Sequence, residues 1–444
     1  MSGQANSEGV RGRLISGIKW TALQSVFVAA SNFATAVMVA RLLGVDSFGA
    51  FSIIRITGFS LATMAGAGLG ITATKYIAEM RAQGNARLGK IIGLCSIVAI
   101  CTSIGFAGAL WLFADEIATT LLKAPQIAGQ LSIAAVYIFF VTLNGYQVGA
   151  LVGFEAFAIL AKLNLLQAFL SLILTYLLTV EWGLTGAVVS LGVAAFTNWV
   201  FHQLVIRREM NNHDMEIQYS QSWQEKRVLI DFTFPAAISS IIGVLTVWGC
   251  NAYLVRQPDG LIQVGIFSAV NTLRSFILFV PGLVSRVASP ILCNLMGKRN
   301  QSSYVRLFWT NIATAAAASS GVAGILVFAA PYILKLFGKD FGAGGAVAMV
   351  VVVMTVIEVM ANAFYSSILV HGRLWWQLRV ILCWSTALGA VTYLTVGNYG
   401  ALGLAYAYLV AHIVSLAMYV FITFKVNGTR MPGAPNNTPL PLPD

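Results

Sequence analysis

The feature that most constrains this chain is a series of long apolar runs, each about as long as a bilayer is thick. A hydrocarbon core of about 30 Å requires about 20 apolar residues in one helix. Of the 444 residues, 58% are hydrophobic and only 10% are charged, which lies outside the composition of soluble globular domains. The sequence therefore predicts an all-α polytopic membrane protein.

Twelve apolar runs meet the length criterion for a transmembrane helix. The first run is longer than the roughly 7–15 apolar residues of a cleavable signal peptide, so we count it as a span. The predicted spans are 18–40, 48–73, 90–113, 127–152, 160–180, 183–206, 228–253, 261–290, 307–331, 344–370, 374–396 and 400–425.

The distribution of lysine and arginine predicts the orientation of these spans. Cytoplasmic loops of membrane proteins carry an excess of both residues. With the N-terminus in the cytoplasm, nineteen of the 27 basic residues fall in cytoplasmic segments and five on the opposite side. We therefore expect both termini in the cytoplasm. The five basic residues on the opposite side are Arg41, Lys123, Arg256, Lys335 and Lys339.

The longest polar stretch divides the apolar sequence into two halves of six spans. It covers residues 207–227 and is predicted to be a cytoplasmic linker. The tail is rich in proline and poor in apolar residues, which predicts disorder. The expected organisation is a cytoplasmic N-terminal segment (1–17), an N-terminal six-helix lobe (18–206), the linker (207–227), a C-terminal six-helix lobe (228–426) and a disordered cytoplasmic tail (427–444).

Two local matches between the halves indicate an internal duplication. "FGAFSIIRITGFS" (48–60) aligns with "VGIFSAVNTLRSF" (264–276) at an offset of 216 residues, and "YLLTVEWGLTGAVVS" (176–190) aligns with "YLTVGNYGALGLAYA" (393–407) at an offset of 217. Halves of six spans each have the same orientation, so the two lobes should be related by a pseudo-twofold axis along the membrane normal. This arrangement predicts a central cleft between the lobes, where a transported substrate binds.

Arginines inside the spans are the strongest candidates for a binding site in that cleft. Arg274 aligns with position 58, one helical turn from Arg55 and on the same helix face. Asn271 is the counterpart of Arg55 and lies one turn from Arg274. A guanidinium suits phosphate oxygens because it presents five donors in a rigid fork. We therefore predict that Arg55, Arg274 and Asn271 bind an anionic, phosphate-bearing cargo.

Glu358 is the one acidic residue deep in a predicted span, and it leaves two interpretations open. A carboxyl group in a low-dielectric site could carry a proton as the cleft alternates between the two sides of the membrane. It could instead remain ionised as the structural partner of Arg274. In that second interpretation an intramembrane arginine stabilises the helix bundle and binds no cargo.

The sequence shows no pattern typical of an enzyme, a metal site or a nucleic-acid-binding domain. Its five cysteines lie in apolar runs without the short spacings of zinc or redox sites. We find no nucleophile and base pair, metal-ligand cluster or phosphate-binding glycine loop. The basic residues are spread through short loops and form no compact basic domain. We expect no cofactor, no metal and no nucleic acid.

Several stretches resemble the polysaccharide repeat-unit flippases. These are the Wzx-type or O-antigen branch of the MOP superfamily, which also contains the MATE multidrug antiporters. The resemblance covers about residues 14–426. The stretches are "ARLLGVDSFGAFSI" (40–53), "GLGITATKYIAE" (68–79), "DFTFPAAISS" (231–240), "VGIFSAVNTL" (264–273) and "VPGLVSRVASPIL" (280–292).

The resemblance implies a V-shaped pair of lobes and alternating access in a bacterial plasma (inner) membrane. The implied cargo is an undecaprenyl-diphosphate-linked oligosaccharide, moved to the outer leaflet during synthesis of a surface polysaccharide such as O-antigen or exopolysaccharide. A cationic cavity receives the diphosphate in such flippases, and Arg55 and Arg274 fit this role by position. The implied partners are the lipid bilayer, a polysaccharide polymerase and a chain-length regulator.

Three other functions fit the sequence less well. A MATE-like exporter of cationic drugs is expected to place carboxylates in its N-terminal lobe, where the deep charge here is basic. A lipid II flippase of the same superfamily usually has fourteen spans, whereas twelve are predicted here. A membrane-embedded polymerase or glycosyltransferase needs catalytic acids or bases on a sizeable outer loop, and the predicted outer loops are short.

Overall fold

The computed structural model describes residues 2–83, 87–212, 216–228, 233–297, 301–370 and 374–427. These residues are helical and contain no strand. The predicted tail falls almost entirely outside them. The ten α-helices are α1 (Ser2–Ala65), α2 (Leu69–Gln83), α3 (Arg87–Glu116), α4 (Ala128–Gly153), α5 (Phe157–Asn212), α6 (Phe234–Val255), α7 (Gly260–Gly297), α8 (Gln301–Phe337), α9 (Gly345–Val370) and α10 (Leu374–Asn427).

Nine helices within the described residues are long and apolar enough to cross a membrane. Three of them are far longer than one crossing requires, and each contains a glycine with a non-helical backbone: Gly44 in α1, Gly183 in α5 and Gly400 in α10. Side-chain hydrogen bonds show that the chain reverses at the last two glycines. The Thr175 hydroxyl lies 3.0 Å from that of Ser190, although residues 15 apart in a straight helix are separated by about 22 Å.

The reversals at Gly183 and Gly400 have nearly the same backbone geometry. Their φ/ψ angles are 55°/−133° and 53°/−127°, which only glycine adopts without strain. These two glycines occupy equivalent positions in the second of the two sequence matches. The duplication predicted from the sequence therefore coincides with a repeated structural feature.

The predicted second span, 48–73, is not one continuous helix. Helix α1 ends at Ala65, and α2 begins at Leu69 and continues to Gln83. Gly68 between them has a φ of +79°, and a Cβ there would lie 2.6 Å from the carbonyl oxygen of Thr233. The run was predicted as one helix because it is predominantly apolar over its whole length. The glycines that interrupt it also allow close approach to α6.

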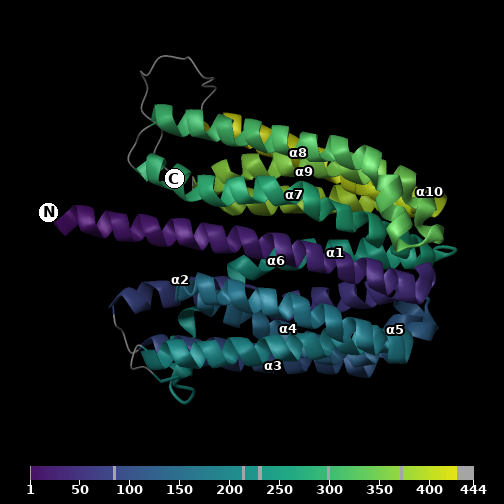
Figure 1. Ribbon diagram of the computed structural model, residues 1–444, viewed down its shortest axis with the longest axis horizontal. Helices are drawn as coiled ribbons and strands as arrows, with labels where there is room; N and C mark the ends of the chain where they lie inside the picture. The colour runs from purple at the N-terminus through teal and green to yellow at the C-terminus, as the bar shows by residue number, and fades with distance from the viewer. Residues whose placement is uncertain are drawn as a thin grey trace.

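The helices form two groups with α1 and α6 between them (Figure 1). Helices α2 to α5 lie on one side and α7 to α10 on the other. We call the end of the bundle that carries the junctions α2/α3, α4/α5 and α7/α8 the basic end, since most of the described lysines and arginines lie there. The reversals at Gly44, Gly183 and Gly400 lie at the other end, which we call the far end.

The apolar core joins the two groups at the far end only. One large cluster of buried residues there includes Phe48 and Ile54 of α1 together with Phe267 and Leu273 of α7. Toward the basic end the core divides into two clusters, one within α2 to α5 and the linker and one within α7 to α10. The two halves are therefore packed together at the far end and separate toward the basic end.

Two aligned glycines make the close approach of the halves possible. A Cβ added at Gly49 would lie 3.1 Å from the amide nitrogen of Gly265, and a Cβ added at Gly265 would lie 3.3 Å from the amide nitrogen of Gly49. Aromatic rings complete the contact, among them Phe33 against Phe276 at 5.4 Å between centroids. Any side chain larger than hydrogen at either glycine would force α1 and α7 apart.

The linker after α5 packs on the start of α3 at the basic end. The amide of Gln218 donates a hydrogen bond to the carbonyl oxygen of Gly89 (3.2 Å), and Arg87 forms a two-point ion pair with Glu225 (2.6 and 2.8 Å). The Arg87 guanidinium lowers the pKa of Glu225 below its usual range through these hydrogen bonds. The predicted cytoplasmic linker is thus a docked segment of the N-terminal half.

We expect Gly68→Ala to lower the thermal stability of the purified protein in detergent. The left-handed backbone alone costs about 1–2 kcal/mol with a side chain, and the new methyl group would collide with Thr233. Gly108→Ala is the matched control, because a Cβ at that position of α3 meets nothing within 4 Å and alanine favours a helix interior. Equal unfolding temperatures for the two variants would contradict this account of the break.

The linker ion pair should give a pH-dependent contribution to stability. Because the folded-state pKa of Glu225 is lowered, its contribution is present above the ordinary glutamate pKa of about 4.3 and is lost as the pH falls through the folded value. We expect Glu225→Gln to destabilise the protein by at most about 1 kcal/mol at neutral pH. The difference from wild type, measured by thermal unfolding, should vanish on acidification. A difference that persists at pH 3 would exclude the ion pair as its source.

Candidate functional site

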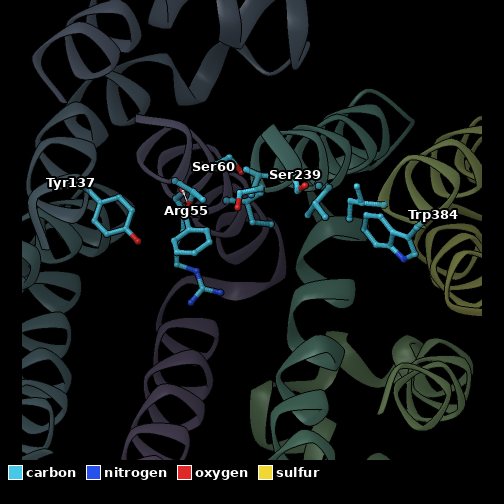
Figure 2. A pocket seen from close by; sticks show the side chains of 13 residues that line it. Arg55, Ser60, Tyr137, Ser239 and Trp384 are labelled. Atoms are coloured by element: carbon cyan, nitrogen blue, oxygen red, sulfur yellow. Dashed lines mark hydrogen bonds between the residues drawn. The ribbon is translucent and has the colours of Figure 1, made fainter. Parts of the chain in front are cut away.

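A cavity of about 640 Å³ lies between the two halves. Figure 2 shows Arg55, Ser60 and Tyr137 from the N-terminal half facing Ser239 and Trp384 from the C-terminal half. The cavity is open rather than enclosed, in agreement with the separation of the two halves toward the basic end. The lining residues are Arg55, Ile56, Phe59, Ser60, Thr63, Tyr137, Ser239, Ser240, Gly243, Val244, Val247, Ile381 and Trp384.

Helical periodicity explains which residues reach the cavity. The lining positions of α1 (55, 56, 59, 60 and 63) and of α6 (239, 240, 243, 244 and 247) follow the spacing of three to four residues that defines one helix face. Each stripe combines apolar side chains with hydroxyl groups. The two facing stripes give the cavity apolar walls with a few polar groups.

Among the described residues, Arg55 is the only charged one that lines this cavity. Its guanidinium carbon lies 5.9 Å from the centroid of the Phe51 ring. Within the described parts of the chain no carboxylate forms an ion pair with it. Among the described residues, the titratable group that interacts with it is the Tyr137 hydroxyl of α4. Arg55 thus presents an uncompensated positive charge to the cavity.

Arg274 has a different environment. Its Nε donates a hydrogen bond to Glu358 Oε2 (2.7 Å), and its Nη2 donates a second to Glu358 Oε1. This two-point ion pair joins α7 to α9, and neither Arg274 nor Asn271 belongs to the cavity lining. Among the two roles that the sequence left open for Glu358, the geometry matches the ion pair with Arg274.

Tyr137 and Trp384 flank the cavity from opposite sides and were not predicted from the sequence. Both lie in apolar runs where an aromatic residue is ordinary. One signal for Tyr137 existed in the sequence. Position 58 is glycine where the second half has Arg274, and a Cβ there would lie 2.8 Å from the Tyr137 ring. The glycine therefore makes room for the ring beside Arg55.

The cavity is closed on its far side by contacts between the halves. The indole nitrogen of Trp248 in α6 donates a hydrogen bond to the Thr57 hydroxyl of α1 (3.0 Å). On the basic side, within the described residues, a hydrogen bond joins the hydroxyls of Thr72 and Thr233 (2.8 Å), beside the approach of Gly68 to Thr233. The contact between the halves is therefore a packed core on the far side of the cavity and a smaller polar contact on the basic side.

The chemistry of the lining suits an anion that carries uncharged polar groups. A free guanidinium binds phosphate or carboxylate oxygens in a bidentate manner, and the hydroxyls of Ser60, Thr63 and Ser239 offer weaker neutral hydrogen bonds. A cation would find no carboxylate among the described residues of this lining. The described residues also contain no group of three or more histidine, cysteine, aspartate or glutamate residues that could hold a metal ion.

Comparison with known sequences gives one family and two curated relatives. The family described as "polysaccharide biosynthesis protein" matches residues 14–296. The succinoglycan biosynthesis transport protein ExoT of Rhizobium meliloti is 24% identical over 420 residues, which are 93% of this chain and 80% of that protein. The EPS I polysaccharide export inner membrane protein EpsE of Ralstonia nicotianae is 21% identical over 84% of this chain and 85% of that protein.

Comparison with solved structures identifies the fold. An inward-facing multidrug resistance MATE family transporter of the MOP superfamily has a TM-score of 0.73 at 13% identity, over 91% of this chain and 98% of that one. The lipid II flippase MurJ in an inward closed conformation has the same TM-score and identity over 91% and 87% of the two chains. The fold is MATE-like, and the expectation of a transporter rather than an enzyme is confirmed by the family and by its transport and export relatives.

The two arginines should differ in their effect on stability. Arg274→Met would leave Glu358 buried without a partner, which we expect to lower the free energy of unfolding by about 3 kcal/mol. Arg55→Met leaves no described carboxylate without a partner, so it should leave the free energy of unfolding unchanged or raise it. Thermal unfolding in detergent measures both, and the double variant Arg274→Met/Glu358→Leu should recover most of the loss. If Arg55→Met destabilised the protein as much as Arg274→Met, the distinction between a free and a paired arginine would be wrong.

Proposed function

The chain belongs to the polysaccharide biosynthesis protein family, and from this premise we propose that it is a flippase for lipid-linked glycans. Its cargo is an undecaprenyl-diphosphate-linked oligosaccharide repeat unit. The protein moves this cargo from the cytoplasmic to the outer leaflet of the bacterial inner membrane by alternating access. The transport and export proteins among its relatives and its MATE-like fold support polysaccharide-related transport; the lipid-linked cargo is our proposal.

The observation that carries the proposal is the free guanidinium of Arg55 in the cavity between the halves. A charged side chain near the bilayer centre costs at least about 2.5 kcal/mol, and such residues are functional by default. Arg274 is compensated by Glu358, whereas Arg55 has no such partner among the described residues. An anionic headgroup that enters the cavity would supply the missing charge.

The cavity lining supports the glycan part of the proposal. Hydroxyl groups and the indole of Trp384 lie opposite Arg55, and an oligosaccharide offers both hydroxyls and apolar ring faces to such a surface. The part of the lining that the structure describes contains no carboxylate, which disfavours the alternative of a MATE-like exporter of cationic drugs. In this proposal Arg55 binds the diphosphate. Arg274 and Asn271 belong to the C-terminal side of the site and do not contact the cargo directly in this conformation.

We propose a membrane topology of twelve spans, with both termini in the cytoplasm. The nine membrane-capable helices give twelve crossings if the helices that contain Gly44, Gly183 and Gly400 each cross twice. The basic end would then face the cytoplasm. The lobes 18–206 and 228–426 would be related by a pseudo-twofold axis, which is supported by the mutual contact of Gly49 with Gly265 and by the equal geometry of the two later reversals.

The conformation described here corresponds to a cytoplasm-facing state in this proposal. The halves are packed at the far end and apart toward the basic end. Transport would require the contact between Gly49 and Gly265 to open while the basic ends approach each other. The lipid tail would stay in the bilayer, and a polymerase and a chain-length regulator would act on the product at the outer surface.

We expect Arg55→Ala to impair flipping strongly in a strain that lacks the chromosomal gene. A charge-assisted bidentate contact contributes about 1.5–3 kcal/mol, so transport should fall by about tenfold or more. The measurement is the amount of surface polysaccharide, together with the amount of lipid-linked repeat unit on the cytoplasmic face. The first should fall and the second should rise, at normal abundance of the variant in the membrane.

Arg256→Ala is the matched control, because it removes an arginine at the end of α6 away from the cavity. It should restore surface polysaccharide to the wild-type level. Full rescue by Arg55→Ala would remove the role of that arginine in cargo binding. A deletion strain with normal surface polysaccharide and increased sensitivity to cationic drugs would instead support the exporter.

A further inference from the structure

A second group of basic residues lies outside the cavity, around one tryptophan at the basic end. The guanidinium carbon of Arg379 lies 4.5 Å from the centroid of the Trp376 ring, and the ammonium group of Lys425 lies 5.6 Å from the same centroid. The two cations are 46 residues apart in the sequence and come from the beginning and the end of α10. They meet because α10 reverses at Gly400.

The ring that holds the two cations is fixed in place. Trp376 is half-buried and packs against the apolar core of the C-terminal half. Its neighbour Gln377 accepts a hydrogen bond from the hydroxyl of Tyr419 (2.7 Å), which ties the first limb of α10 to the second. The positions of Arg379 and Lys425 are therefore set by the fold of α10 and not by a flexible loop.

The charge at this site is uncompensated. The distances to the shared centroid place the two cations no more than about 10 Å apart, and in the described residues no carboxylate pairs with either. Like charges at this separation repel each other. The aromatic face attracts each cation but does not cancel the sum of their charges, so an anion that contacts both would complete the site.

The location suggests what kind of anion this is. Trp376 and Lys425 lie close to the beginning and the end of α10 (Leu374–Asn427), whose apolar limbs are able to cross the membrane, so we place both near the boundary between the hydrocarbon core and water. Tryptophan and basic residues at this depth contact lipid headgroups. Both cations are exposed and face surroundings that contain lipid phosphate at high concentration.

We propose that Trp376, Arg379 and Lys425 form a binding site for an anionic lipid phosphate at the membrane surface of the basic end. The ring positions the two cations, and the phosphate oxygens accept hydrogen bonds from both. The site is separate from the cavity, although Trp384, which lines the cavity, lies eight residues further along the same helix, or about 12 Å. The inference does not depend on the identity of the cargo in the cavity.

The test is a count of retained lipids by native mass spectrometry, on protein released from membranes of equal phosphatidylglycerol and phosphatidylcholine. We expect Arg379→Gln/Lys425→Gln to lose one tightly bound phosphatidylglycerol, with at least a fivefold fall in occupancy of that class. Trp376→Leu leaves both charges but removes the ring, so occupancy should fall by a smaller factor. Lys335→Gln is the matched control, because this cation also lies over an exposed ring, that of Tyr332 at 5.7 Å, at the far end.

Two results would overturn the proposal. One is an unchanged count of phosphatidylglycerol in the double variant. The other is an equal fall in Lys335→Gln, which would mean that only net charge matters. A thermal unfolding temperature close to that of wild type ensures that the double variant is folded. If the basic residues only fastened the limbs of α10 together, unfolding would shift and lipid retention would not.

A second arm of the experiment distinguishes two sources of lipid phosphate. A short-chain polyprenyl diphosphate is added to the wild-type protein that carries phosphatidylglycerol. If the polyprenyl diphosphate displaces the phospholipid at a concentration well below that of the phospholipid, the site is assigned to diphosphate lipids. Retention of the phospholipid assigns it to the bulk anionic lipid of the membrane, and either result supports a lipid phosphate site when the double variant has lost it.

Discussion

The cost of placing a guanidinium away from bulk water governs the interior of this protein. An arginine inside a membrane bundle must be paired, reach the surface or face a hydrated cavity. Arg274 follows the first route through Glu358, and Arg55 follows the third. The separation of the two halves toward the basic end is therefore linked to the position of Arg55, since tight packing of α1 against α6 along their whole length would bury its charge.

Glycines decide where the two halves can touch and where the chain can turn. Gly49 and Gly265 bring α1 and α7 into backbone contact at the far end, while Gly68 allows α2 to approach Thr233 at the basic end. The first contact lies within a large apolar core, and the second is supported by one hydrogen bond between hydroxyls. The two halves are therefore held together more strongly at the far end than at the basic end in this conformation.

The sequence was sufficient for features that depend on local composition. Apolar run length predicted the membrane helices, the repeat predicted that Gly183 and Gly400 are equivalent, and the isolated charge in an apolar run drew attention to Arg55. Features that depend on contacts between distant segments were out of reach. The break before α2 depends on Thr233, and the roles of Tyr137 and Trp384 depend on which helices face the cavity. Arg274 could be matched with Glu358 only as one of two alternatives.

The most direct test of this account is an experimentally determined structure of the protein with a polyprenyl-diphosphate-linked oligosaccharide in a lipid environment. The account predicts that the diphosphate lies in the cavity between the halves, within hydrogen-bonding distance of the Arg55 guanidinium, while Arg274 remains paired with Glu358. A headgroup bound elsewhere, with Arg55 joined to a carboxylate of the protein, would contradict the claim that this arginine is kept free for an anionic cargo.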